Sequence, residues 1–417
     1  MRVLWLTNIM MQDYLEYFNM PVTGTGFWMH SLVSPLSKRV DKLGIVYAGC
    51  NCLNHELMIN GIDYFTIKQS KISQVFNIGS SRDEEKCLKS IVSVIKKFRP
   101  DIIHIHGTER FYGRLKVENF TNIPVVISIQ GIMSECAKYA WGDKSVIDIF
   151  YMINLNEIIH LFPTLFRKRK YITNAKREEK IIKNVDAILG RTDWDRSYVY
   201  KIAPNAKYYS VNELMRSQFY KSCWEFKKCQ RYTIYTSGRI NFMKGIHVLI
   251  EAILILKNQY KNVFLCIAGT VTKSLEFDYC NMLIKKLNLQ NNVKFVGYIG
   301  ENQIVKQLLS SNCYVNSSFI ENGCNALQEA MLIGCPCVAT YTGGMVTTLR
   351  HYETGLMAPI GSPHLLASMI QKIFDNEDLA CQLGSNARKV ALERHNYEQV
   401  LDSLIKSYSL VINDYSV

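Results

Sequence analysis

The sequence predicts an α/β protein with two domains, each a parallel sheet covered by helices on both faces. Short, nearly continuous apolar runs such as PDIIHIHG and PVVISIQG alternate with helical segments along the chain. Runs of this kind are typical of parallel strands that are buried on both faces. The chain has 417 residues, of which 48% are hydrophobic. That is enough to build two ordinary hydrophobic cores.

The elements follow one another in an order that places the domain boundary near residues 216–230. We predict an N-terminal domain at 1–216, a C-terminal domain at 217–395 and a final helix at 396–417 that packs back on the N-terminal domain. The predicted strands are 2–7, 43–48, 62–67, two that end at His106 and Gln130, 186–190, 206–212, 232–237, 263–268, 293–297, 313–317 and one that starts at Cys337. The main predicted helices are 27–36, 85–98, one from Gly245, 326–333, one from Gly344 to His351, 362–374, 376–394 and 397–411.

Composition excludes several other classes of protein. No apolar run reaches the ~18 residues of a membrane-spanning helix, and residues 1–6 predict a first strand rather than a secretion signal. The thirteen cysteines are an odd number without zinc-ligand spacing, so we expect reduced thiols in a cytoplasmic protein. The net charge of +13 favours an anionic partner such as nucleic acid, a membrane or a glycolipid. Nucleic acid is disfavoured because no motif combines aromatic and basic residues for that purpose.

The stretch SSFIENGCNALQEAMLIGCPCVATYTGG carries the clearest functional pattern. A buried strand precedes it, a polar turn holds Glu321, and an amphipathic helix holds Glu329 about one turn inside. Gly334 is expected to end that helix, and Thr342, Gly343 and Gly344 follow the next strand. Ligands of parallel sheets bind at the carboxyl ends of the strands, where a helix N-terminus offers free N–H groups. Both carboxylates can therefore point toward one ligand.

A second pattern follows the strand 232–237. Gly238 and Arg239 come directly after it, and Lys244 and Gly245 stand at the start of an apolar helix. An Arg fork and a Lys point charge at such a position suit a diphosphate.

These two patterns together resemble the donor site of the retaining glycosyltransferases of family 4, which have the GT-B fold of two Rossmann-like domains facing a cleft. The resemblance covers most of the second domain. In the first domain it rests on PDIIHIHG, IQG and the strand order. It implies transfer of a sugar from a nucleoside diphosphate donor to a glycan or lipid-linked glycan acceptor, as in cell-surface polysaccharide synthesis. It implies no metal and no other cofactor.

The resemblance also assigns roles to residues. Glu329 would bind the ribose and Glu321 the hydroxyls of the donor sugar, while Arg239 and Lys244 would stabilise the departing diphosphate. Donor contacts would come from Gly238, Gly323, Asn325, Thr342, Gly343 and Gly344. The order Glu-Asn-Gly-Cys-Asn at 321–325 departs from the usual E-G-F-G, so the resemblance does not identify the sugar.

Four residues of the first domain are candidates for the cleft: Gly24, Gly26, His106 and Gln130. Gly24 and Gly26 loosely resemble the family's glycine-rich loop, and they lack the spacing of a dinucleotide-binding fingerprint. Gln130 stands where relatives carry a histidine, and a carboxamide cannot titrate near neutral pH. For His106 a structural hydrogen bond and a role in the cleft are equally supported by the sequence.

Asp193-Trp194-Asp195 matches the D-x-D metal motif of the other large glycosyltransferase fold. Two carboxylates at a strand end could hold Mg²⁺. Because three letters are a weak match, we favour capping of the helix that starts at Trp194.

The stretch 167–183 contains eight basic residues and the two acids Glu178 and Glu179. It follows an apolar segment with Phe162, Leu165 and Phe166. Either it is a solvated helix face, or Arg167, Lys168, Arg169 and Lys170 contact an anionic membrane or acceptor. The second interpretation predicts a protein that is peripheral on the inner face of the plasma membrane.

Two other functions remain open from the residues alone. One is a GT-B nucleotide-sugar epimerase, and the other is a catalytically silent subunit that binds a nucleotide sugar. The donor base, sugar, acceptor, linkage and oligomeric state are not encoded in any pattern that we recognise.

Overall fold

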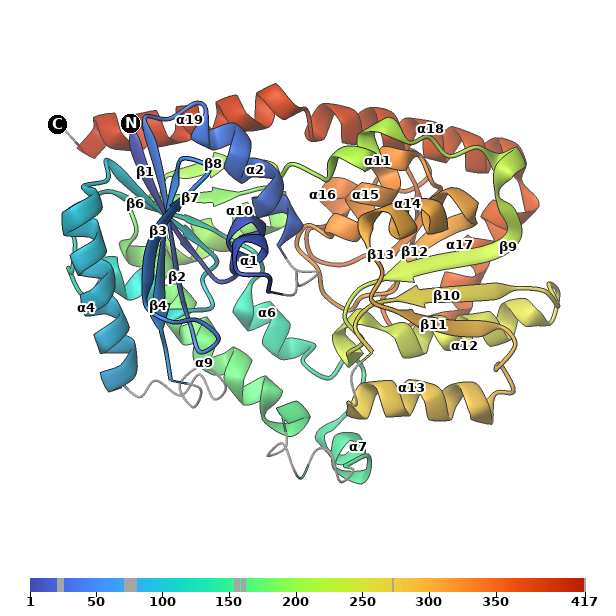
Figure 1. The fold of residues 1–417 in the computed structure, drawn as a ribbon. Coiled ribbons are helices and arrows are strands. Elements are labelled where there is room, and N and C mark those ends of the chain that lie inside the picture. Colours follow the sequence, from blue (N-terminus) through green and yellow to red (C-terminus); the bar gives the residue numbers. More distant parts are fainter. Residues whose placement is uncertain (21–25, 71–80, 154–157, 159–162, 272–273, 416–417) are drawn as a thin grey trace. The chain divides into compact units, whose positions relative to one another are not determined.

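The computed structural model describes residues 1–20, 26–70, 81–153, 158, 163–271 and 274–415 (Figure 1). These residues form two compact units. The first unit contains residues 1–134, 170–214 and 396–417, and the second contains residues 135–169 and 215–395.

The first unit is built on a sheet of eight strands. They lie in the order β3-β4-β2-β1-β5-β6-β7-β8, and every pair is parallel except β3 with β4. Their bounds are β1 Arg2–Thr7, β2 Lys42–Gly49, β3 His55–Ile59, β4 Ile62–Lys68, β5 Ile102–His106, β6 Val125–Ser128, β7 Ala187–Gly190 and β8 Tyr208–Ser210. β3 was not predicted, because its burial alternates on an edge strand and leaves no continuous apolar run.

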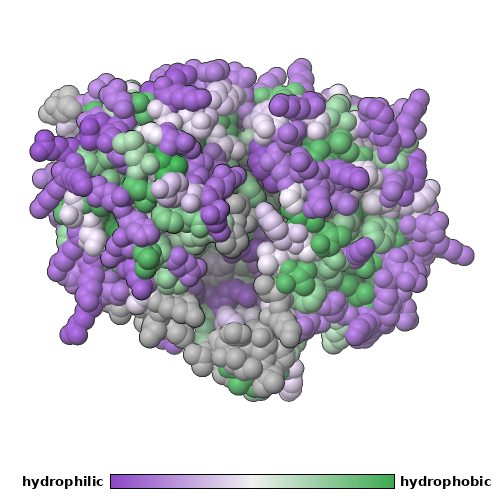
Figure 2. Space-filling view, viewed as in Figure 1, coloured by the Kyte–Doolittle hydropathy of each residue, from purple (hydrophilic) through white to green (hydrophobic). Residues whose placement is uncertain are grey.

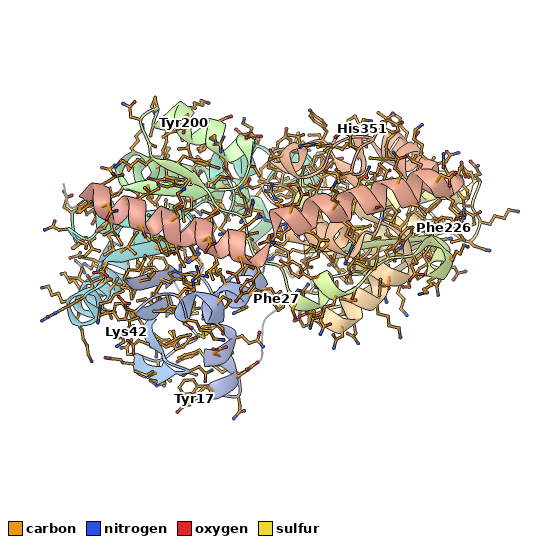
Figure 3. The ribbon with its side chains drawn as sticks, turned by 90° about the horizontal axis from the view of Figure 1, so that it is seen from above. Tyr17, Phe27, Lys42, Tyr200, Phe226 and His351 are labelled. Carbon is orange, nitrogen blue, oxygen red and sulfur yellow. The ribbon has the colours of Figure 1, made fainter. Side chains whose placement is uncertain are left out.

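Helices cover both faces of this sheet. α2 (Phe27–Ser37) and α19 (Tyr397–Tyr415) share one apolar core with Trp5 of β1. α4 (Ser81–Phe98), α9 (Pro163–Asn184) and α10 (Asp193–Ile202) contribute to the core on the other face. α19 lies across the sheet in the view of Figure 3. Shorter elements are α1 Gln12–Tyr17, η1 Phe111–Gly113 and α5 Arg114–Val117, and α6 Met133–Lys138 continues from this unit into the second.

The second unit has a sheet of six parallel strands in the order β11-β10-β9-β12-β13-β14. They are β9 Gln230–Ser237, β10 Phe264–Ala268, β11 Val293–Gly297, β12 Ser311–Asn316, β13 Cys337–Thr340 and β14 Leu356–Ala358. The helices that pack on it are α12 Ile246–Lys257, α13 Leu275–Lys286, α14 Glu301–Ser310, α15 Asn325–Ile333, α17 Pro363–Asp375 and α18 Glu377–Arg394. Shorter elements are α11 Ser217–Lys221, η2 Phe226–Lys228, η3 Phe242–Lys244 and α16 Met345–Thr348.

Residues 135–169 belong to the second unit, whereas a boundary at 216 would assign them to the first. α7 (Val146–Tyr151) packs through Ile149 in a small core with Phe242 and Leu275. Asp143 Oδ1 lies 2.9 Å from His247 Nε2, and Arg167 pairs with the buried Glu276. These contacts join residues far apart in sequence, so no local pattern indicates them.

Several smaller expectations are corrected. The predicted strand 206–212 is only Tyr208–Ser210, and the helix after Gly344 ends at Thr348 rather than at His351. None of the thirteen cysteines, all of which lie in the described residues, forms a disulfide. Among the described residues, no helix is long and apolar enough to cross a membrane.

Candidate functional site

In the second unit the strand order reverses between β9 and β12, which pair with each other. Ligands of open α/β sheets bind at the carboxyl ends of strands at this point. Gly238 and Arg239 follow β9, and the loop that carries Glu321 follows β12. The two sequence patterns therefore meet at one end of one sheet, although more than seventy residues separate them.

Lys244 and Glu321 form an ion pair at this place, and Glu321 Oε1 also accepts a hydrogen bond of 2.9 Å from Ser318 Oγ. Burial lowers the pKa of Lys244, but the interactions with Glu321 and Cys324 together raise it by more, so the net shift is upward and the ammonium stays charged. Arg239 is exposed, and its positive charge repels that of Lys244 and acts to lower the pKa of Lys244. The site thus holds two cations and one carboxylate within a short range.

The turn between β9 and α12 requires glycine at position 245. Gly245 has φ 63°, and a Cβ there would lie 2.0 Å from the carbonyl oxygen of Ser317. Asn241 accepts a hydrogen bond of 3.1 Å from the Lys244 N–H and starts the short helix η3. This close approach of two loops brings Lys244 within reach of Glu321.

The predicted contacts Thr342, Gly343 and Gly344 support the Glu321 loop. Thr342 Oγ1 donates to the carbonyl of Phe319 at 2.8 Å, and the Gly344 N–H donates to the carbonyl of Glu321 at 3.0 Å. Gly343 has φ 48°, and a Cβ there would lie 2.0 Å from the backbone carbonyl oxygen of Glu321. These residues fix the backbone that carries the carboxylate.

Glu329 lies buried in α15, and the structure gives it a partner that the sequence did not reveal. Arg216 Nε and Nη2 donate to its two carboxylate oxygens at 2.8 and 2.7 Å. Burial raises the pKa of Glu329, and the charge of Arg216 counteracts that rise. Arg216 stands alone in a linker between β8 and α11, so no spacing marks it.

The start of α15 carries the remaining two predicted donor contacts. Gly323 lies in the turn before the helix, and Asn325 is its first residue. The side-chain oxygen of Asn325 is buried without a hydrogen-bond partner. An unsatisfied buried oxygen is costly unless a ligand or water meets it. Asn325 therefore fits a ligand-binding position.

In the first unit, His106 and Gln130 line one small pocket at the carboxyl ends of β5 and β6. His106 is buried, and neither ring nitrogen has a hydrogen-bond partner. Burial lowers the pKa of His106 to about 3, so the ring is neutral at physiological pH. A neutral imidazole can exchange hydrogen bonds with hydroxyl groups but carries no charge for an anion.

Arg191 and Glu213 also line this pocket, and sequence reasoning missed both. They form a buried ion pair, and Arg191 Nη2 donates to Gln130 Oε1 at 3.3 Å. Their separation of 22 residues offers no motif. The pair orients the carboxamide of Gln130 while the two charges neutralise each other.

The two candidate glycines near the N-terminus have different outcomes. Gly24 lies outside the described residues. Gly26 precedes α2 with φ 78°, and a Cβ there would overlap the side chain of Ile9. Gly26 is therefore required by the turn into α2.

The D-x-D motif forms the first turn of the helix α10. Thr192, rather than either aspartate, caps α10 by accepting a hydrogen bond of 3.1 Å from the Asp195 N–H. Asp195 accepts hydrogen bonds from the Arg191 N–H and the Tyr208 hydroxyl. Among the described residues no cluster of three or more His, Cys, Asp or Glu has the arrangement of a metal site.

The residues of the basic stretch 167–170 differ in their contacts. Arg167 pairs with Glu276, which is 2% exposed, and Lys168 lies over the ring of Trp141 at 5.4 Å. Arg169 belongs to the second unit and Lys170 to the first. Phe162 lies outside the described residues, whereas Phe166 is half-exposed. Arg167 is thus held in an ion pair of the second unit, whereas Lys168, Arg169 and Lys170 are exposed. The assignment of these four residues to a membrane or acceptor patch stays a prediction.

Comparison with known proteins agrees with this geometry. Residues 225–390 match the family described as glycosyl transferases group 1. An uncharacterised glycosyltransferase of Methanocaldococcus jannaschii is 20% identical over 95% of this chain and 97% of its own length. The capsular polysaccharide biosynthesis glycosyltransferase CapM of Staphylococcus aureus is 25% identical over 42% of this chain and 46% of its own.

Solved structures show the same fold over the whole chain. Sucrose-phosphate synthase from Thermosynechococcus elongatus superposes with a TM-score of 0.75 at 15% identity, covering 99% of this chain and 100% of that one. WaaG, a glycosyltransferase involved in lipopolysaccharide biosynthesis, has a TM-score of 0.65 at 12% identity over 98% and 99%.

The chain is a glycosyltransferase with the GT-B fold. The group 1 match includes Arg239, Lys244, Glu321 and Glu329. It leaves out Arg216, nine residues before the matched region begins.

Proposed function

We propose that this glycosyltransferase moves a sugar, with retention of its anomeric configuration, from a nucleoside diphosphate sugar to a glycan or lipid-linked glycan in cell-surface polysaccharide synthesis. The observation that carries the proposal is the meeting of Lys244, Glu321 and Arg239 at the carboxyl ends of β9 and β12. Two permanent cations beside an acceptor of hydroxyl hydrogen bonds suit a diphosphate joined to a sugar.

The roles of the side chains follow from their chemistry. Arg239 and Lys244 stabilise the charge that grows on the departing diphosphate, which is often the largest catalytic term. Glu321 accepts hydrogen bonds from the sugar hydroxyls, and Glu329, held by Arg216, accepts them from the ribose. Of the similar structures, HepE was solved with UDP-glucose, and a mutant of TarM with fondaparinux, alpha-GlcNAc-glycerol and UDP.

The place of action is the cytoplasmic face of the membrane, where a lipid-linked acceptor is presented. The net charge of +13 supports contact with an anionic surface. No metal is required in this proposal, because the two basic side chains supply the positive charge.

Donor binding is the first test. A thermal-shift screen of nucleoside diphosphates and their sugars should reveal the donor, since a ligand stabilises the folded state by mass action. The anomeric configuration of the product, measured by NMR, then tests retention. A donor that binds without hydrolysis or transfer would indicate a silent binding subunit, and a rearranged sugar without acceptor would indicate an epimerase.

Catalytic variants are the second test. Lys244→Ala and Arg239→Ala should each lower kcat by about 10²-fold or more, because their charge matters most as the diphosphate leaves. Lys306→Ala, on the surface of α14, is the matched control and should have no effect. Activity should persist in EDTA. Loss in EDTA with rescue by Mg²⁺ would show that a metal supplies charge after all.

A further inference from the structure

α7 presents an apolar face to solvent. Val146, Ile147, Phe150 and Tyr151 are 50, 62, 65 and 84% exposed. Their spacing places them on neighbouring positions of the helix surface. Ile149 is fully buried and attaches the opposite side of α7 to Phe242 and Leu275. Figure 2 shows a small hydrophobic area at the lower edge of the view, near the position that α7 occupies in Figure 1.

The short helix is held firmly in this orientation. Ser145 and Asp148 form a capping box at its start, with bonds of 2.8 and 3.1 Å. Asp143, two residues earlier, bonds His247 of α12. Aromatic side chains on a fixed helix are ordinarily buried, so their exposure calls for a partner.

A basic pocket adjoins this face. Its volume is about 350 Å³, and Lys138, Lys144 and Lys168 line it together with Trp141 and the first residue of α7. None of the described residues that line it is acidic. Lys138 and Lys144 bond Glu135 and Asp143, which lie outside the lining.

The combination favours one partner. Apolar side chains beside several cations match the boundary between acyl chains and phosphate groups in an anionic membrane. A protein groove would cover the apolar residues but gives no reason for three adjacent lysines. The pocket and the apolar face also lie in one segment, 135–169, which is attached to the donor-binding unit.

We propose that α7 and the pocket of Lys138, Lys144 and Lys168 form a docking surface for anionic membrane lipids. Phe150 and Tyr151 enter the lipid interface, and the lysines bind lipid phosphates. This inference rests on the proposed function in one respect only, namely that the acceptor is reached at a membrane. It keeps Lys168 of the basic run 167–170 and adds α7, Lys138 and Lys144, which line or adjoin the same pocket.

The full-length protein should co-sediment with vesicles of phosphatidylcholine and phosphatidylglycerol, more weakly with phosphatidylcholine alone, and less as salt rises. Phe150→Ser/Tyr151→Ser should weaken binding at least about tenfold, since two large apolar side chains no longer leave water. Lys138→Ser/Lys168→Ser should remove the preference for the anionic vesicles.

Matched controls lie elsewhere in the same unit. Met282→Ser/Tyr298→Ser removes two half-exposed apolar side chains, and Lys285→Ser/Lys286→Ser removes two exposed cations of α13. Both controls should bind vesicles like the wild type. Phe150→Trp provides a folded reporter whose fluorescence should shift to the blue when anionic vesicles are added.

Equal vesicle binding by the wild type and Phe150→Ser/Tyr151→Ser would overturn the proposal. So would a dimer that becomes monomeric in this variant without a change in vesicle binding, because α7 would then be an interface between copies. Turnover of the donor with a water-soluble acceptor is measured in parallel. Vesicle binding without turnover would reject the proposed function alone, and turnover without vesicle binding would reject the docking surface alone.

Discussion

Near the proposed donor site, loss of Arg216 is expected to lower the free energy of unfolding strongly. Its guanidinium donates two hydrogen bonds to the carboxylate of Glu329 and neutralises its charge, and both side chains are buried. Arg216→Ala leaves a buried carboxylate without its counter-charge, so the free energy of unfolding should fall by about 3–5 kcal/mol. Urea unfolding measures this, and the affinity for the nucleoside diphosphate should fall as well.

An exposed pair supplies the control for Arg216. Arg350 and Glu353 are 3.5 Å apart and both are exposed. Arg350→Ala should change the free energy of unfolding by less than about 0.5 kcal/mol. If the two variants cost the same, Arg216 does not have the role assigned here.

Glu178 predicts a pH dependence of stability. Burial raises its pKa to about 7, while Thr108 Oγ1 and the Met133 N–H, the latter at 2.9 Å, donate to its carboxylate. Because the folded pKa exceeds the unfolded one, the folded state binds the extra proton between about pH 4.5 and 7. Stability therefore falls as pH rises through this window, by up to about 3 kcal/mol.

Glu178→Gln removes this titration while it keeps an acceptor for Met133. The variant should have a higher Tm than the wild type at pH 8 and about the same Tm at pH 4.5. Calorimetry at both pH values measures the difference. A constant difference in Tm across pH would show that Glu178 does not titrate in this range.

At the scale of elements, the contact between the β12–α15 loop and the β13–α16 loop sets the position of Glu321. Both loops leave parallel strands at the same edge of the sheet, and Thr342 and Gly344 join them by hydrogen bonds. These hydrogen bonds join one loop to the other. The carboxylate of Glu321 therefore takes its position only when β12 and β13 pair in the correct register.

Gly343→Ala tests this contact. The substitution forces a Cβ against the Glu321 carbonyl at a positive φ, so the loop must move. Turnover should fall by more than tenfold while the unfolding free energy falls by about 1–3 kcal/mol. Gly300→Ser is the control, because a Cβ at Gly300 meets no atom within 4 Å. Wild-type turnover in Gly343→Ala would show that the loop tolerates displacement.

At the scale of the molecule, the chain passes between the two units after Ser134, Arg169, Leu214 and His395. The last passage brings α19 onto the first unit directly after α18 of the second. Tyr408 of α19 anchors it, since its hydroxyl accepts from Trp5 Nε1 at 3.0 Å and lies 2.6 Å from His104 Nδ1.

Tyr408→Phe should therefore destabilise the first unit. The indole N–H of Trp5 and one nitrogen of His104 would be buried without partners, at a cost of about 1–3 kcal/mol each. Tyr397→Phe, at an exposed position of the same helix, should be neutral. Denaturant unfolding followed by tryptophan fluorescence compares the two variants. Equal stability would mean that water or another group satisfies Trp5.

The parts of the fold that the sequence predicted depend on local patterns. The predicted strands β1, β2, β4, β5, β9 and β12 are all present, and β1 and β2 contain nearly continuous apolar runs. Gly334 ends α15 in the left-handed conformation as expected. Arg239 and Lys244 lie in one strand–loop–helix unit, and Glu321 and Glu329 lie in another. The spacing within each pair is therefore a local feature of the sequence. Short-range backbone preferences and the carboxyl-end rule for parallel sheets were sufficient to predict that the loops of Lys244 and Glu321 meet at one end of one sheet.

Tertiary structure alone decided which side chains meet across the chain. The partners of Glu329, Gln130 and Arg167 are Arg216, Arg191 and Glu276, at sequence separations of 113, 61 and 109 residues. No local sequence pattern predicted that residues 135–169 belong to the second unit, or that α7 has an exposed apolar face. The physical reason is that a buried charge requires one compensating partner, but any Arg or Glu in the chain can supply it. Periodicity determines the strands and helices, whereas only the packed fold determines which charges neutralise one another.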